Sequence, residues 1–344
     1  MIYNEDMKKD FKSRQTRLRV GFFGVRSWER EIIEKEISRL DNFGVGIFED
    51  VVEENIELAK KYEILSVFVN SCLDRKILAK LPNLKMIATR STGMDHVDAE
   101  ECEKKKIVFK NVPEYGSITV AEYAFALLLA IAKKIVVAHQ VVEEGEFNPE
   151  GLTGVDVFGK TLGVVGVGRI GRNMIKMGKG FGMKILGVGR KRDVKLEKKL
   201  GFKYVSLEEC LKESDFVSLH VPSTFKTFHL INRNNITLMK KGSFLINTCR
   251  GPVIEAESIL WALNEGILAG VGLDVAEEEK KVVDDRVVMD DKTSKDDLKE
   301  VLSFHMLRDR DDVVYTPHNA FNTVEAVERI VKTTVENIRE FLRD

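Results

Sequence analysis

The sequence predicts an α/β protein made of two domains, each built around a parallel β-sheet. At 344 residues the chain is long for one average domain and suits two, each large enough to bury its own core. Short apolar segments alternate with amphipathic segments along most of the chain, as they do when strands and helices take turns in a parallel sheet. The alternation occurs in two separate series, so we expect two sheets with helices on both faces.

The first series starts at Arg17 and predicts the sheet of the first domain. Its apolar segments are short and rich in valine, isoleucine and phenylalanine, which favour strands. The expected strands are 19–25, 44–48, 64–69 and 84–90, and the expected helices between them are 28–40, 51–62 and 74–81.

The second series starts at Thr161 and predicts the sheet of the second domain. Its apolar segments again have the length of strands and are separated by segments with a helical pattern. The expected strands are 161–167, 184–189, 202–205, 215–221, 242–247, 269–275 and 313–316.

The range Ser117–Glu144 lies between the two series and carries a long apolar run. We expect one long buried helix here, with Ser117 and Thr119 as candidate caps, which joins the domains or faces a partner subunit. Its charged residues leave too short an uncharged stretch for a transmembrane helix.

The last segment, Asn322–Arg343, is amphipathic and should pack back on the first domain. The first domain is then discontinuous and comprises 1–117 and 320–344, while the second comprises 118–319. The range Glu277–Asp312 interrupts the alternation because it is dense in charge and weak in apolar periodicity. We expect a solvated surface excursion there, with a functional lid as the alternative.

The composition excludes several classes of partner. Lysine plus arginine (54) balance aspartate plus glutamate (55), so no strong field favours nucleic acid or a membrane surface, and a small-molecule ligand is expected. The polar range Met1–Arg19 offers no signal peptide or spanning helix, which indicates a cytoplasmic protein. The four cysteines are far apart and form no Cys-x-x-Cys pair, so neither disulfides nor a metal site is expected.

A glycine turn, GVGRIG, occupies residues 166–171 between a predicted strand and an amphipathic helix. Gly166 would permit the tight turn, Gly168 would let phosphates approach the backbone, and Gly171 would allow close packing of the helix. The amino terminus of the helix would then face the negative pyrophosphate of a dinucleotide. The strand, turn, helix and second strand together indicate a Rossmann-type dinucleotide site.

The strand that follows this helix ends in Gly189, where such sites usually carry an acid that binds the adenosine ribose. Glycine followed by Arg190 would accept a 2′-phosphate that an acid would repel. The sequence therefore favours NADP(H) over NAD(H). Asp193, in a longer turn, could supply the missing acid instead, which leaves NAD(H) open.

Three later segments place an arginine, glutamates and a histidine after the ends of predicted strands. These residues are Arg250, the run Glu277–Glu279, and His318. Ligands of open α/β sheets bind beyond the carboxyl ends of the strands, so we expect these side chains to converge there.

Together these segments resemble the D-isomer-specific 2-hydroxyacid dehydrogenase family over nearly the whole chain. The matching motifs are STGMDHVD (91–98), VPEY (112–115), VAE (120–122), the glycine turn, SLHVP (218–222), NTCRG (247–251), GLDV (272–275) and TPHNAF (316–321). Within the family, Tyr115, the Ala320-Phe321 ending and the insert after Glu279 are similar to the D-lactate dehydrogenase branch. The resemblance implies a Rossmann nucleotide domain, a flavodoxin-like substrate domain, an active site in the cleft between them, and a homodimer.

The resemblance also implies a role for each catalytic residue. Arg250 would bind the substrate carboxylate and polarise the keto oxygen. His318 would donate the proton during reduction and accept it in reverse. Glu279 lies five residues after Asp274, where the family places the acid that orients the imidazole and favours its charged form.

Further binding residues come from the same resemblance. Thr92 and Gly93 would hold the substrate carboxylate through their N–H groups, and Tyr115 would close on it. The cofactor contacts that the resemblance implies are Arg169, Ile170, Val221, Pro222, Thr227, Thr248, Cys249, Arg250 and Asp274. They add to the contacts expected from the glycine turn and the strand after it, which are Gly166, Gly168, Gly171, Gly189 and Arg190.

These residues favour a D-2-hydroxyacid dehydrogenase, with D-lactate and pyruvate as the first pair to test. An NADPH-dependent glyoxylate or hydroxypyruvate reductase is the alternative, favoured by Gly189 and Arg190. A dinucleotide-sensing, corepressor-like module is an alternative of a different class, because such proteins can keep the same residues.

Overall fold

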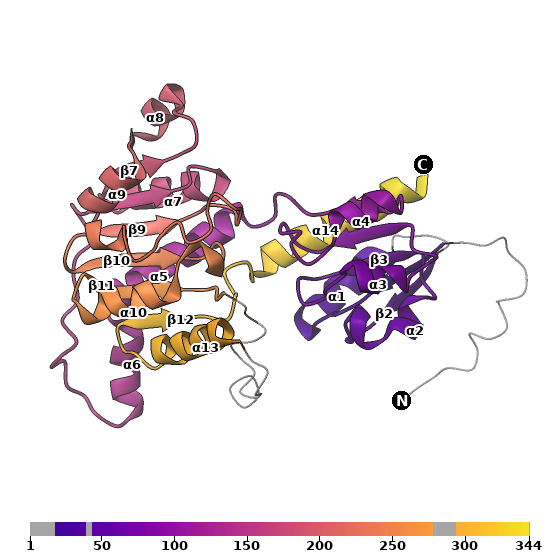
Figure 1. Cartoon of the computed structure of the whole chain (residues 1–344), viewed down its shortest axis with the longest axis horizontal. Helices are drawn as coiled ribbons and strands as arrows, with labels where there is room; N and C mark the ends of the chain where they lie inside the picture. The colour runs from indigo at the N-terminus through magenta and orange to yellow at the C-terminus, as the bar shows by residue number, and fades with distance from the viewer. Residues whose placement is uncertain (1–17, 39–42, 278, 280–293, 344) are drawn as a thin grey trace, which may run out of the picture. The chain divides into compact units, whose positions relative to one another are not determined.

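The computed structural model describes residues 18–38, 43–277, 279 and 294–343. The chain divides into two compact units (Figure 1), which we call unit 1 (1–115 and 323–344) and unit 2 (116–322). The predicted amino-terminal segment falls outside the described residues up to position 17. In the described part, both predicted parallel sheets are confirmed.

Unit 1 contains a five-stranded parallel sheet in the order β2-β1-β3-β4-β5. Its strands are β1 (Arg19–Phe22), β2 (Gly44–Ile47), β3 (Ile64–Val67), β4 (Met86–Thr89) and β5 (Val108–Lys110). This is the flavodoxin-like order. The edge strand β5 was not expected from the sequence, because it has only three residues and two of them are exposed.

Helices cover both faces of the unit 1 sheet. They are α1 (Ser27–Ile37), α2 (Ile56–Ala59), α3 (Arg75–Ala79), α4 (Ala99–Lys104) and α14 (Val324–Arg343), with a short 3-10 turn, η2 (Val52–Glu54). The carboxyl-terminal α14, yellow in Figure 1, packs on α1 and β4. Its buried face, which includes Val327, Val331 and Val335, closes one of the two cores of the unit.

Unit 2 contains a seven-stranded parallel sheet in the order β12-β11-β10-β9-β6-β7-β8. Its strands are β6 (Thr161–Val165), β7 (Lys184–Val188), β8 (Lys203–Tyr204), β9 (Phe216–Leu219), β10 (Ser243–Asn247), β11 (Leu268–Leu273) and β12 (Val313–Tyr315). The order reverses between β6 and β9, and ligands of such sheets bind beyond the strand ends at this point.

The register of this sheet lines up the carboxyl ends of its strands. Val165 pairs with Val188 on one side and with Leu219 on the other. Leu219 pairs with Asn247, which pairs with Leu273. The loops that carry the predicted site residues of unit 2 therefore begin at the same level of the sheet.

Helices and 3-10 turns surround the unit 2 sheet. They are α5 (Ser117–Ala132), α6 (Ile135–Glu143), α7 (Arg169–Gly180), α8 (Val194–Leu200), α9 (Leu207–Glu213), α10 (Ala256–Asn264), α13 (Lys295–Arg308), η3 (Ile236–Leu238) and η4 (Gly251–Val253). One core contains residues of α5 and α7, and a separate core contains residues of α9 and α10. The sheet is thus buried on both faces, as its continuous apolar strands predict.

The prediction of one long buried helix over Ser117–Glu144 is wrong. The helix breaks at Lys134, whose φ of 52° is left-handed, and α5 and α6 meet at 62°. The N-cap of α5 is Gly116, with no capping side chain among the described residues. No residue of α6 is buried, so its apolar residues do not serve the core of unit 2.

The charged range Glu277–Asp312 is also more regular than predicted. Residues 295–308 form α13, which packs on α10 and β12. Val301 and Leu307 on this helix are buried. The prediction of a solvated excursion is therefore wrong for α13, while 278 and 280–293 lie outside the described residues.

Within the described ranges, no single helix is long and apolar enough to cross a membrane. The bent pair of α5 and α6 meets the same test only by its combined length and composition.

Candidate active site

The glycine turn between β6 and α7 leaves one glycine open to a ligand and packs the other two tightly. Gly166 has a φ of 105°, which favours glycine, and a Cβ atom there would overlap the carbonyl of His220. A Cβ atom on Gly171 would overlap the carbonyl of Gly166. Gly168 is exposed, and a Cβ atom there would meet no heavy atom within 4 Å. The turn therefore has room for a ligand at Gly168.

The amino terminus of α7 follows this open glycine. Gly168 is the N-cap, and among the described residues no side chain caps the first turn, which begins with Arg169 and Ile170. The first turn also carries no acidic residue. Its N–H groups are thus available to an anion, and a dinucleotide pyrophosphate fits this chemistry.

The loop after β7 presents a free cation beside Gly189. Arg190 is exposed and makes no ion pair within the described chain, whereas Arg192 pairs with Glu197 at 2.9 Å. Asp193 caps α8 by accepting hydrogen bonds from the N–H groups of the first turn. Its carboxylate is therefore already engaged, which weakens the alternative that it replaces the missing ribose acid.

The loop after β9 begins with a partly buried histidine and is closed by a threonine. His220 Nε2 lies 2.9 Å from Ser218 Oγ, and burial lowers the pKa of His220 to about 4, so the ring is neutral at neutral pH. Val221 is half-buried and Pro222 is exposed. The Thr227 hydroxyl donates to the Pro222 carbonyl at 2.6 Å, which folds these predicted cofactor residues into one compact loop.

The loop after β10 is organised by the side chain of Asn247. Its amide donates to the Arg250 carbonyl at 3.0 Å, and its oxygen accepts a hydrogen bond from the Cys249 N–H. Arg250 Nη1 donates to the Cys249 carbonyl at 2.7 Å. The Thr248 hydroxyl is buried with no partner in the described chain. An unpaired buried hydroxyl is costly, and a bound dinucleotide could satisfy it.

Asp274, at the end of β11, fastens the loop that follows β12. Its carboxylate accepts hydrogen bonds from the Thr316 hydroxyl and from the N–H groups of Asn319 and Ala320, the latter two at 2.8 Å. The N–H of His318 donates to its carbonyl, also at 2.8 Å. Burial raises the pKa of Asp274, although these side-chain hydrogen bonds act against the rise. The Asp274 side chain thus holds the loop in place; a cofactor contact from it stays a prediction.

His318 and Glu279 form a hydrogen-bonded pair. His318 Nδ1 lies 2.9 Å from both carboxylate oxygens of Glu279, and both side chains are partly exposed. Nδ1 therefore carries a proton and donates it in a hydrogen bond to the Glu279 carboxylate. Nε2 is then the ring nitrogen that can face a substrate. His318 has a φ of 52°, and such strain in a non-glycine residue is found where function holds it.

In unit 1, the loop after β4 offers two free N–H groups. Within the described chain, neither Thr92 nor Gly93 uses its N–H in a hydrogen bond. The loop is held instead by its other atoms: Thr92 Oγ1 donates to the Val112 carbonyl at 2.7 Å, and Asn111 donates to the Thr92 carbonyl at 2.8 Å. This arrangement suits a carboxylate ligand.

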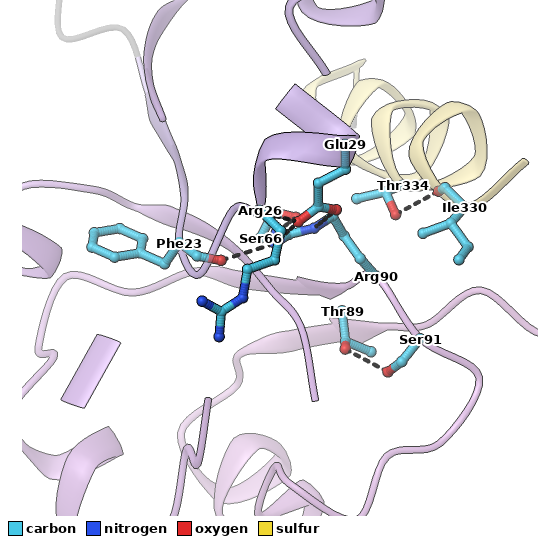
Figure 2. Close-up of polar contacts among 9 residues, drawn as sticks. All are labelled: Phe23, Arg26, Glu29, Ser66, Thr89, Arg90, Ser91, Ile330 and Thr334. Carbon is cyan, nitrogen blue, oxygen red and sulfur yellow. Dashed lines mark hydrogen bonds and ion pairs between the residues drawn. The ribbon is translucent and has the colours of Figure 1, made fainter. Parts of the chain in front are cut away.

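A buried ion pair lies at the start of the same loop (Figure 2). Arg90 is fully buried and forms a two-pronged contact with Glu29, at 3.0 and 3.1 Å. It also donates to Ser66 Oγ and to the Phe23 carbonyl. Arg90 thereby joins β3 and the ends of β1 and β4 to α1. This pair was not expected from the sequence, because Arg90 and Glu29 lie 61 residues apart.

Hydrogen-bonded side chains extend this support into the loop itself. A hydrogen bond, drawn as a dashed line in Figure 2, joins Thr89 Oγ1 and Ser91 Oγ. Thr89 Oγ1 is 2.8 Å from Ser91 Oγ and 2.8 Å from His96 Nε2. The Ser91 hydroxyl in turn contacts the Gly93 carbonyl at 2.7 Å. Tyr115 is half-buried, and its side-chain role stays a prediction. Among the described residues, no group of three or more metal-ligating side chains lies together.

Comparisons with known proteins identify the family of this chain. Residues 125–320 match the model of the D-isomer specific 2-hydroxyacid dehydrogenase, NAD binding domain. A glyoxylate reductase of Korarchaeum cryptofilum is 36% identical over 91% of each chain, and one of Pyrococcus horikoshii is also 36% identical over 91% of each.

Solved structures show the same two-domain fold. The D-lactate dehydrogenase of Aquifex aeolicus, crystallised with NAD and lactic acid, has a TM-score of 0.82 at 36% identity and covers 94% of this chain and 96% of its own. The pyruvate reductase of Chlamydomonas reinhardtii has a TM-score of 0.85 at 32% identity, covering 95% and 97%. The chain therefore belongs to the D-isomer specific 2-hydroxyacid dehydrogenases, a family of NAD(P)-dependent oxidoreductases.

Proposed function

We propose that the protein reversibly reduces a short 2-keto acid to the D-2-hydroxy acid with a nicotinamide dinucleotide. The observation that carries this proposal is the His318–Glu279 pair, which lies at the same sheet edge as the open glycine turn. A proton donor and a dinucleotide site at one edge are the two parts that a carbonyl reduction needs.

Each catalytic residue has a role that its chemistry supports. Arg250, always charged, binds the substrate carboxylate and polarises the keto oxygen. His318 Nε2 donates the proton to that oxygen during reduction, and Glu279 fixes the ring through Nδ1. The bound nicotinamide supplies the hydride. Thr92, Gly93 and Tyr115 are proposed as further substrate-binding residues.

We propose pyruvate and D-lactate as the first substrate pair. Solved structures of D-lactate dehydrogenases support it, whereas the glyoxylate reductases among the relatives support glyoxylate or hydroxypyruvate. Rates of reduction of pyruvate, glyoxylate and hydroxypyruvate, each with NADH and NADPH, test the proposal. A higher kcat/KM for glyoxylate selects the second pair. Tight dinucleotide binding with no turnover of any keto acid contradicts the enzyme and favours a dinucleotide-sensing module.

The proposed cofactor is NADP(H), because Gly189 leaves no acid to repel a 2′-phosphate and Arg190 is free to bind one. Changing Gly189→Asp together with Arg190→Ala should shift the kcat/KM ratio toward NADH by about 10–100-fold, the value of one charge-assisted hydrogen bond. Steady-state kinetics with both cofactors measures this ratio. Arg192→Ala is the matched control, since Arg192 is paired with Glu197; an unchanged ratio in the double variant would sink the assignment.

Glu279 should affect the rate of reduction by fixing the His318 ring through Nδ1. Glu279→Ala removes the hydrogen-bond acceptor and leaves the ring free to turn, so kcat should fall by about 10–100-fold. Glu279→Gln keeps an acceptor for Nδ1 and should retain most of the kcat. Steady-state rates of the two variants check this, and equal kcat values for the two would count against the pair.

We also propose a homodimer. The support is α6, where none of the residues is buried and Ile135, Val136 and Val142 are exposed. Sedimentation equilibrium of the purified protein tests this proposal.

A further inference from the structure

A second histidine–carboxylate pair lies among the loops that follow the carboxyl ends of the unit 2 strands, which we call the active edge. His229 Nε2 is 3.3 Å from both carboxylate oxygens of Glu277. The two side chains are 31% and 14% exposed, so the contact is largely shielded from solvent. The roles proposed above involve neither residue.

The His229 ring is held in one place by its surroundings. The backbone of His229 has a left-handed φ of 46°, a conformation that non-glycine residues rarely adopt. The backbone N–H of His229 donates to the Pro252 carbonyl at 2.8 Å, and the backbone carbonyl of His229 accepts a hydrogen bond from the Asn232 side chain. The ring stacks on Phe228 with centroids 4.0 Å apart. The imidazole therefore acts as a fixed point.

This fixed point joins the two loops that carry proposed catalytic residues. Pro252 lies two residues after Arg250, and Glu277 lies two residues before Glu279. The loops also touch directly, because a Cβ atom on Gly251 would overlap the backbone of Ala276 and Glu277. His229, in the loop after β9, thus contacts the Arg250 loop through its backbone N–H and the Glu279 loop through its imidazole ring.

We infer that His229 and Glu277 form a positioning pair that sets the location of Arg250 and Glu279 at the active edge. The inference rests on the proposed function, because it assigns the pair's effect to the reduction of a 2-keto acid. A misplacement of about 1 Å can cost 10²-fold in rate, so loss of the pair should lower kcat more than it changes KM for the cofactor.

A double-mutant cycle tests the inference. His229→Ala and Glu277→Ala should each lower kcat by about 10–100-fold, and the double variant should be no worse than the poorer single variant, since the two act as one unit. His229→Gln, which keeps a donor, should restore most of the lost kcat. Multiplicative losses in the double variant, or a loss confined to KM, would overturn the inference.

Two further measurements separate this inference from folding defects and from the proposed function. The exposed pair of Glu208 and Lys212, 2.6 Å apart on α9, supplies the control, and Glu208→Ala should leave kcat unchanged. The 15N–1H spectrum of the imidazoles in protein without cofactor should show the His318 signals shifted by Glu277→Ala; unshifted signals oppose the inference. If the wild-type protein reduced none of the keto acids, the proposed function would be contradicted. The positioning inference would still be tested, because the imidazole spectrum needs no turnover.

Discussion

Replacing His318 with glutamine is expected to lower kcat for keto-acid reduction by about 10²–10⁴-fold, the usual contribution of a positioned acid or base. Glutamine can still face Glu279 and hydrogen-bond a substrate, but it cannot transfer a proton. The loss should therefore appear in kcat, with dinucleotide affinity unchanged. Stopped-flow or steady-state rates together with a fluorescence titration of NAD(P)H would measure both quantities.

Lys212→Gln is the control for this substitution, because Lys212 is exposed on α9, where it pairs with Glu208 of the same helix. It should leave both the rate and the affinity as they are. A general acid contributes at least about 10²-fold to kcat. If His318→Gln kept more than about a tenth of the wild-type kcat, the loss would be smaller than this, and His318 would not be the proton donor.

Replacing Arg90 with methionine is expected to lower the free energy of unfolding by about 3–5 kcal/mol. Arg90 and Glu29 are 0% and 1% exposed, so the change would leave an uncompensated carboxylate in the core of unit 1. Urea unfolding monitored by circular dichroism would measure the loss. The double variant Arg90→Met with Glu29→Leu should recover much of it, because no buried charge remains.

The exposed pair of Arg30 and Glu49 provides the comparison. Its atoms are 3.0 Å apart, but the side chains are 34% and 78% exposed, and Arg30→Met should cost less than about 1 kcal/mol. Equal losses for Arg90→Met and Arg30→Met would show that the buried pair has no special role. A recovered double variant with a raised KM for the keto acid would instead show that Arg90 also shapes the Thr92 loop.

Features that depend on local pattern could be predicted from the sequence. Continuous apolar runs predicted the buried strands, and the spacing of residues 166–171 predicted the turn. The resemblance to the family, which places the acid five residues after Asp274, selected Glu279, whose carboxylate contacts His318 in the structure. In these cases the information lies within a few residues of the feature.

Features that depend on distant partners could not be predicted in this way. The pairing of Arg90 with Glu29 joins residues far apart in the sequence, and either alone looks like a surface charge. The break at Lys134 lies inside an apolar run whose composition suits an unbroken helix. Helix α13 buries only a few residues in a highly charged segment, so its apolar periodicity is too weak to detect.

The register of the unit 2 sheet separates the loop that would select the cofactor from the loops that carry the proposed catalytic residues. The Gly189 loop leaves β7 on one side of β6, whereas the loops of Arg250, Glu279 and His318 leave β10, β11 and β12 on the other. Hydrogen bonds to the neighbouring strands fix the end of each strand. One loop can therefore be exchanged without moving the residue at which another loop begins. Grafting residues 189–193 from an NADH-dependent relative should therefore change the electron carrier and leave the choice of acid intact.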